Sequence, residues 1–107
     1  MDNRELLELA AKAAGLSVVW SDQREVLELF GRGESGFVEL KGVWNPLDDD
    51  GDSLRLAVKI GIGVNFYPDS DSVAANIGHD EIVAGMDDYG TRYAIVRVAA
   101  EIGRRMP

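Results

Sequence analysis

The sequence predicts an α+β fold in which helices pack on both faces of a mostly antiparallel β-sheet, an α/β/α sandwich. Two observations lead to this prediction: amphipathic helical patterns lie near the start, the middle and the end of the chain, and short segments rich in β-forming residues lie between them. Helices that alternate with hairpin-like groups of strands are typical of antiparallel α+β proteins. Because 107 residues hold one hydrophobic core, we expect a single domain spanning residues 1–107.

The first helix is predicted over residues 4–14. Its apolar residues recur at helical spacing: Leu6, Leu9, Ala10 and Ala13. Asp2 or Asn3 can cap its start, and Gly15 stands where a left-handed residue commonly ends a helix.

Three strands are predicted next, at residues 17–20, 25–30 and 37–41, with residues 31–36 as the loop of a hairpin. These segments are too short for helices and rich in β-forming residues. Alternation puts Leu27 and Leu29 on one face of the second strand and Glu28 on the other. We expect Val38 and Leu40 of the third strand to point inward as well.

The central segment, Trp44-Asn45-Pro46-Leu47, leads into a second helix that continues to residue 60, and Pro46 holds Asn45 in extended geometry. Four carboxylates stand at the start of this helix: Asp48, Asp49, Asp50 and Asp52. Carboxylates there accept backbone N–H bonds and interact favourably with the helix dipole, so we predict that Asp50 or Asp52 caps the helix. Its apolar residues cover a wide arc, which predicts that it is the most buried helix.

The last third of the chain predicts a strand at residues 62–67 and a pairing of residues 73–77 with 81–84 around a turn that contains His79. A final helix is predicted from Asp87 or Asp88 to about Arg105. Acidic residues at its start and arginines at its end match the helix dipole at both poles.

One glycine motif, Gly31-x-Gly33-x-x-Gly36, matches the spacing of the dinucleotide fingerprint and, with Val38, that of the kinase glycine-rich loop. The fingerprint needs a helix after its third glycine, whereas residues 37–40 are predicted to be a strand. The chain also lacks the other kinase motifs. We therefore interpret this motif as a hairpin loop.

The aspartates at 48–52 and the single histidine, His79, are the candidate metal ligands or acid–base groups. An EF-hand loop that began at Asp48 would need glycine where Ser53 stands and an acidic residue where Lys59 stands. His79 has no identifiable nucleophile to serve. We therefore predict no catalytic residue, no metal site and no cofactor.

Charge and composition exclude several classes of protein. Nineteen acidic residues against eleven Lys and Arg give a net charge of −8, which argues against general nucleic-acid binding. The absence of cysteine rules out disulfides and thiolate metal sites. The N-terminal segment has neither an apolar nor a basic leader, and no apolar run reaches the ~18 residues of a membrane span. We expect a cytoplasmic protein that binds neither nucleic acid nor membrane.

Charge is also distributed unevenly along the chain. Residues 39–90 carry 11 acidic and 3 basic residues, whereas the last 17 residues carry a net charge of +3. Such a polarised surface can steer a partner. Five residues are therefore candidate surface contacts: Trp44, Asp48, Asp49, Arg92 and Arg97.

The opening RELLELAAKAAG at residues 4–15 and the segment WNPLDDDGDSLRLAVKI at residues 44–60 resemble the phage ABA-sandwich domain family of small phage and prophage proteins. A closing helix similar to residues 92–105 completes the likeness. The resemblance implies helices on both faces of a sheet and a phage or prophage origin. It implies no activity.

The leading hypothesis is a non-enzymatic phage accessory protein that binds a host or phage protein. The first alternative is an acidic nucleic-acid mimic that blocks a DNA- or RNA-binding enzyme of the host. The second is a metal-binding or hydrolytic module at Asp48, Asp49, Asp50 and Asp52, with His79 as a further candidate ligand.

Overall fold

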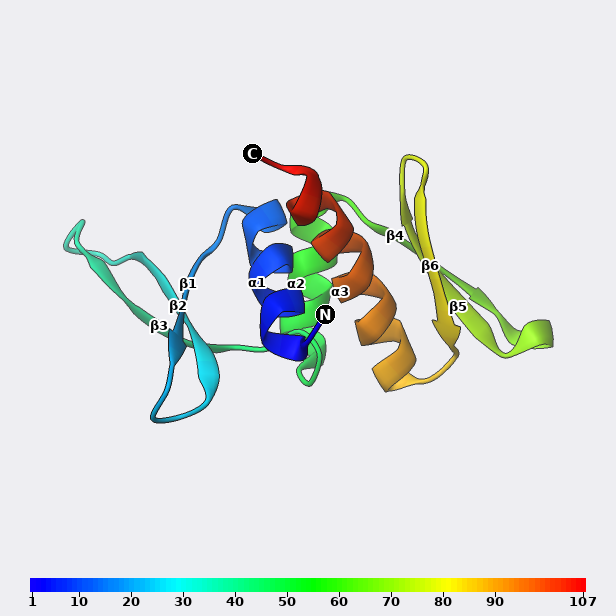
Figure 1. Ribbon diagram of the computed structural model, residues 1–107, viewed down its shortest axis with the longest axis horizontal. Helices are drawn as coiled ribbons and strands as arrows, with labels where there is room; N and C mark the ends of the chain where they lie inside the picture. Colours follow the sequence, from blue (N-terminus) through cyan, green and yellow to red (C-terminus); the bar gives the residue numbers. More distant parts are fainter.

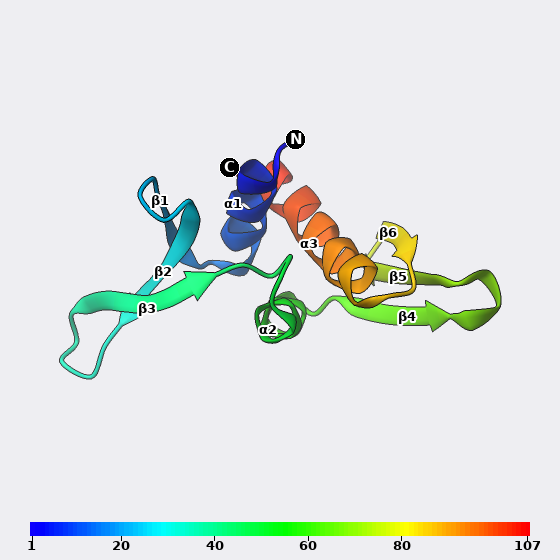
Figure 2. The same ribbon diagram turned by 90° about the horizontal axis from the view of Figure 1, so that it is seen from below.

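A computed structural model describes residues 1–107 and places three helices between two small β-sheets (Figure 1). Along the chain the elements are α1 (Asn3–Ala14), β1 (Ser17–Ser21), β2 (Val26–Arg32), β3 (Val38–Trp44), α2 (Asp50–Ile60), β4 (Gly63–Tyr67), the 3-10 turn η1 (Pro68–Ser70), β5 (Ser72–Ile77), β6 (Asp80–Gly85) and α3 (Asp88–Arg105). The molecule is elongated, 49 × 27 × 27 Å, because the sheets extend from opposite sides of the helices (Figure 2).

The strands form two separate antiparallel sheets, of order β1-β2-β3 and β4-β5-β6. The α+β class and the antiparallel pairing are therefore confirmed. The expected single sheet is not observed, because each strand pairs only with its neighbours in sequence and α2 separates the two groups. The helices lie between the sheets, and an arrangement with helices on both faces of one sheet is not confirmed (Figures 1 and 2).

The helix ends follow the capping residues that the sequence predicts for α1 and α3. The Asp2 side chain accepts a hydrogen bond from the Glu5 backbone N–H at 2.8 Å, and Gly15 ends α1 with a φ of +69°. Asp87 accepts from the Gly90 N–H at 2.6 Å and so begins α3. Side chains at these positions satisfy N–H groups that have no partner within the helix.

The core lies where α1 crosses α3, and small residues line this contact. Ala10, Ala94 and Ala99 have no exposed surface. Gly103 is packed so closely that a Cβ atom there would lie 1.9 Å from the Leu9 carbonyl oxygen. The two helix backbones therefore approach each other more closely than larger side chains would allow.

The sequence predicted that α2 is the most buried helix, and this prediction was wrong. Only Ser53, Leu56 and Ala57 of its eleven residues are buried. Leu54 and Val58, which belong to the predicted apolar arc, are 65% and 74% exposed. The arc is wider than the surface that α3 and α1 cover, so its outer part faces solvent.

Val38 and Leu40 also point outward, contrary to the prediction. Leu29 opposes Gly42, but its neighbour Phe30 opposes Leu40, so one extra residue bulges out of β3. A bulge of one residue moves the residues beyond it to the other face of the sheet. Val38 and Leu40 are accordingly 72% and 50% exposed, on the face opposite to the buried Leu27.

The glycine motif is part of a hairpin, as predicted. Gly31 belongs to β2, residues 33–37 form the loop, and β3 follows without a helix. Gly36 has a φ of +84°, a conformation that favours glycine in tight turns.

Candidate interaction groove

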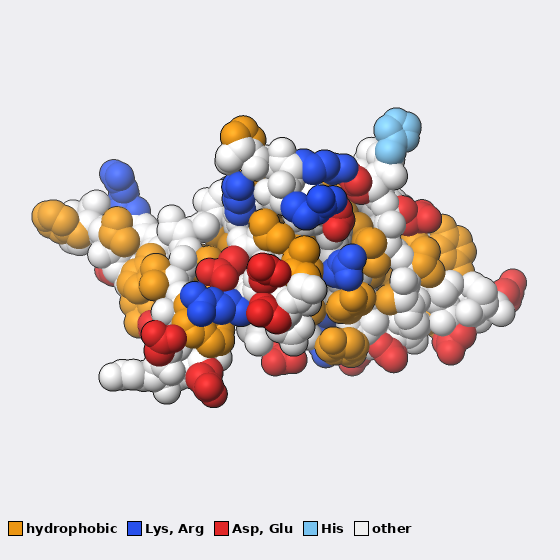
Figure 3. Space-filling view, viewed as in Figure 1, with side chains coloured by type: hydrophobic (Ala, Val, Ile, Leu, Met, Phe, Trp, Pro, Cys, Tyr) orange, Lys and Arg blue, Asp and Glu red, His pale blue; other side chains and the backbone are white.

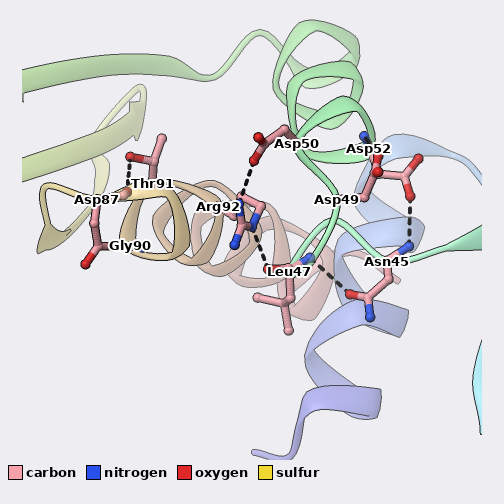
Figure 4. Close-up of polar contacts among 9 residues, drawn as sticks. All are labelled: Asn45, Leu47, Asp49, Asp50, Asp52, Asp87, Gly90, Thr91 and Arg92. Atoms are coloured by element: carbon pink, nitrogen blue, oxygen red, sulfur yellow. Dashed lines mark hydrogen bonds and ion pairs between the residues drawn. The ribbon is translucent and has the colours of Figure 1, made fainter.

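The turn before α2 is held by the side chain of Asn45 (Figure 4). Its Oδ1 accepts from the Leu47 N–H at 3.1 Å, and its Nδ2 donates to Asp48 Oδ2 at 3.1 Å. Its backbone N–H donates to Asp52 Oδ2 at 3.0 Å. Pro46 is almost completely buried within this turn. The distinctive central segment of the sequence is therefore a rigid lead into α2.

Asp49, not Asp50 or Asp52, caps α2, which corrects the prediction. The Asp49 carboxylate accepts from the Asp52 N–H at 2.7 Å. Asp52 instead binds the turn through Asn45 and binds Arg55 at 2.8 Å. The helix therefore begins at Asp50, and Gly51 lies inside its first turn.

Asp50 pairs with Arg92 of α3 (Figure 4). Arg92 Nη1 donates to Asp50 Oδ1 at 2.6 Å, and Arg92 Nε donates to the Leu47 carbonyl oxygen at 2.7 Å. The hydrogen bond to Asp50 raises the pKa of Arg92 above its ordinary value. Arg92, a predicted surface contact, is thus half-buried and joins the turn to α3.

The other candidate residues are divided between core and surface. Trp44 is only 3% exposed, so its prediction as a surface residue was wrong: it opposes the buried Leu27 on the helix-facing side of its sheet. Asp48 and Asp49 are exposed. Arg97 lies further along α3, where its Nη1 donates to the Tyr93 hydroxyl at 3.0 Å and its Nε is buried without a partner.

The aspartates diverge into these separate contacts. His79 is exposed in the turn between β5 and β6. No group of three or more His, Cys, Asp or Glu side chains is arranged to hold a metal ion. No helix combines the length and the apolar character needed to cross a membrane.

An open groove of about 490 Å³ lies beside this network, between α2, β4 and the first half of α3. We call it the α2–β4 groove. Its floor is apolar and is formed by Leu54, Val64, Phe66, Met86 and Ile95. Three carboxylates and one cation border it: Asp50, Asp87, Asp88 and Arg92. The groove thus combines exposed apolar surface with an excess of negative charge.

Ser53 adds an unsatisfied polar group to the α2–β4 groove. Its side chain is 2% exposed, lines the groove, and has no hydrogen-bond partner for its hydroxyl. Buried hydroxyls are normally hydrogen-bonded, and one without a partner costs about 1–3 kcal/mol. Ser53 Oγ itself has less than 1 Å² of accessible surface, so it is a buried polar group behind the groove wall.

The amino-acid sequence did not predict the α2–β4 groove. Leu54 belongs to the arc of the second helix that the sequence predicts to be buried, and Phe66 lies in the strand predicted at residues 62–67. One signal was available: the apolar arc of α2 is wider than a single neighbouring helix can cover. The meeting of α2 with β4 and α3 depends on tertiary contacts that periodicity does not contain.

Basic side chains gather away from the acidic groove. Arg104 and Arg105 stand in the last turn of α3, and Lys12 Nζ donates to the Met106 carbonyl oxygen at 2.9 Å. Figure 3 shows Lys and Arg side chains grouped near the C-terminus. Arg105 also donates to Asp80 at 2.9 Å, which lowers the pKa of that carboxyl.

Comparison of the chain with protein-family models, with curated proteins and with solved structures finds no match. The resemblance to the phage ABA-sandwich domain family stays a prediction.

Proposed function

We propose that this chain is a small phage or prophage accessory protein that acts without catalysis, by binding another protein of the phage or its host. The α2–β4 groove is the binding surface. The observation that carries this proposal is the uncovered apolar floor of the groove, bordered by three carboxylates. Exposed apolar surface bordered by polar residues is typical of protein-binding sites.

The occupant that fits the groove is an amphipathic, basic helix of the partner. Leu54 and Val58 are one helical turn apart and both exposed, so they form a ridge that can pack against a second helix. Asp87 and Asp88 at the border are matched by Lys or Arg on the partner.

The family resemblance supports a phage origin and, with it, action in the host cytoplasm. Nucleic-acid mimicry would need an array of carboxylates free to face an enzyme. Asp49, Asp50 and Asp52 are each bonded within the chain, which favours protein binding over mimicry. Their divergence likewise does not favour a metal-dependent function.

The test compares the tagged protein with two single variants in affinity purification from lysogenic or infected host cells. Leu54→Asp places a charge on the groove floor, whereas Val83→Asp places one at a similarly exposed site on β6, on the face of the sheet opposite to Val64 and Phe66. Circular dichroism and urea denaturation establish that both variants are folded. We expect a specific partner that Val83→Asp retains and Leu54→Asp loses.

The recovered partner is then titrated by calorimetry at increasing salt. We expect its affinity to fall as salt screens the acidic border. Equal recovery by the wild-type protein and Leu54→Asp, or an affinity independent of salt, would contradict the proposed groove.

A further inference from the structure

The outer face of the β1-β2-β3 sheet is apolar in all three strands. We define this face by the side chains that point away from the helices: the polar Ser17, Ser21, Glu28 and Arg32, and the apolar Val19, Val26, Phe30, Val38, Leu40 and Val43. Four of them are among the exposed large hydrophobic residues. Figure 3 shows hydrophobic side chains gathered over this sheet.

The register places these side chains in rows across the strands, one with Glu28 at its centre and one that ends at Ser17. Val19, Glu28 and Val43 lie opposite one another across the three strands, and Phe30 lies opposite Leu40. The other face carries Leu27 and Trp44 and is buried against the helices. An antiparallel sheet with one face in water normally alternates apolar and polar residues, whereas apolar residues on both faces are typical of a sheet covered on both sides.

The charges on β2 indicate what covers this face. Glu28 and Arg32 lie on the same side of the strand as Phe30, two residues before it and two residues after it. Glu28 has only a 3.5 Å contact with Arg24, and Arg32 makes no ion pair within the chain. Consider two copies stacked face to face, with a two-fold axis between them that crosses over Phe30, parallel to the sheet and perpendicular to β2. Each Glu28 then meets the Arg32 of the other molecule. Such self-complementarity is what an interface between two identical copies requires.

We propose that the outer face of the β1-β2-β3 sheet binds the same face of a second copy of this chain, sheet on sheet. Phe30 lies at the two-fold axis, and Glu28 of each copy pairs with Arg32 of the other. The sheet measures roughly 14 Å by 24 Å, from strand spacings of about 4.8 Å and rises of about 3.4 Å per residue. Two such faces cover about 670 Å² in total, less than the roughly 1,000 Å² that stable interfaces bury, so the dimer is weak and forms only at high concentration.

This dimer goes beyond the proposed function and does not depend on it, because the α2–β4 groove lies by the other sheet. Failure of one proposal therefore leaves the other standing. A dimer presents two α2–β4 grooves, one from each copy, to a partner.

The test is sedimentation velocity of the full chain from about 10 µM to 1 mM, the range in which a weak interface is populated. We expect a concentration-dependent shift from monomer to dimer. Leu40→Asp, at an exposed site on the outer face, should weaken the dimer roughly a hundredfold, because a charge replaces buried apolar surface. Val83→Asp, on the other sheet, should leave it unchanged.

Charge exchange tests the two-fold arrangement itself. Glu28→Arg and Arg32→Glu should each weaken the dimer by about tenfold through like-charge contacts, and the double variant should restore it. Urea denaturation of each variant confirms that it is folded. A monomer at every concentration, a dimer insensitive to Leu40→Asp, or a double variant no tighter than the single ones would overturn the proposal. So would a different protein bound to this face while the chain alone stays monomeric.

Discussion

Replacing Gly103 with alanine tests the closest contact in the core. The added Cβ would lie 1.9 Å from the Leu9 carbonyl oxygen and 2.8 Å from its carbonyl carbon. These are backbone atoms of α1, which cannot rotate away as a side chain can. Helices α1 and α3 must therefore separate by more than an ångström at this end.

The magnitude follows from two opposing effects. Overpacking a well-packed core costs about 1–3 kcal/mol and sometimes more. Alanine in place of glycine within a helix raises the free energy of unfolding by up to ~1 kcal/mol, because alanine has the better helix propensity. Because the clash is with backbone, we expect the upper end of the cost and a net loss of about 2 kcal/mol in the free energy of unfolding.

The assay is urea denaturation followed by circular dichroism, with Gly51→Ala as the matched control. Gly51 is also helical, but its Cβ would meet the flexible Arg55 guanidinium at 3.1 Å. We expect Gly51→Ala to be neutral or stabilising by up to ~1 kcal/mol. If Gly103→Ala unfolds at the wild-type urea concentration with an unchanged slope, α1 and α3 do not make this contact, and the account of the core is wrong.

Three further predictions concern polar groups. Asp49→Ala should lower the free energy of unfolding by about 1 kcal/mol, because it removes the α2 cap. Asp48→Ala, the control, should change the free energy of unfolding by less than ~0.5 kcal/mol. Urea midpoints measure both variants, and equal effects would argue against the cap. Ser53→Ala should leave stability unchanged or raise it, because it removes a buried hydroxyl without a partner, and a clear loss in the same assay would show that the hydroxyl is bonded. Arg105 lowers the pKa of Asp80 from its ordinary value of 3.8, so the ionised carboxylate stabilises the fold above that pH, and this contribution disappears as pH falls through the lowered pKa. Arg105→Gln should raise the Asp80 pKa toward 3.8 in a carboxyl NMR titration, and an unmoved pKa would exclude the pairing.

The ends of α1 and α3 and the positions of the strands were predictable because their signals are local. Asp2 and Gly15 bracket α1 through backbone hydrogen bonds within a few residues, and Asp87 does the same at the start of α3. Hairpin turns between the strands are local in the same sense. None of these features depends on what the element later packs against.

The errors have non-local causes. Whether Leu54 is buried depends on which elements lie beside α2, and helical periodicity cannot distinguish a covered arc from an uncovered one. The division of the strands into two sheets depends on where α2 carries the chain. The choice of Asp49 over Asp50 as cap was a matter of one residue, within the usual uncertainty of helix boundaries.

The bulge in β3, opposite Leu29 and Phe30, determines which side chains form the exterior of the β1-β2-β3 sheet. Deleting Lys41, the extra residue, would remove the bulge but keep Gly42 opposite Leu29 and Leu40 opposite Phe30, so Leu40 would still point outward. A strand paired without the bulge, with Lys41 opposite Phe30, would instead turn Leu40 and Val38 toward the helices. The exterior of this sheet is therefore set by the pairing register of β3.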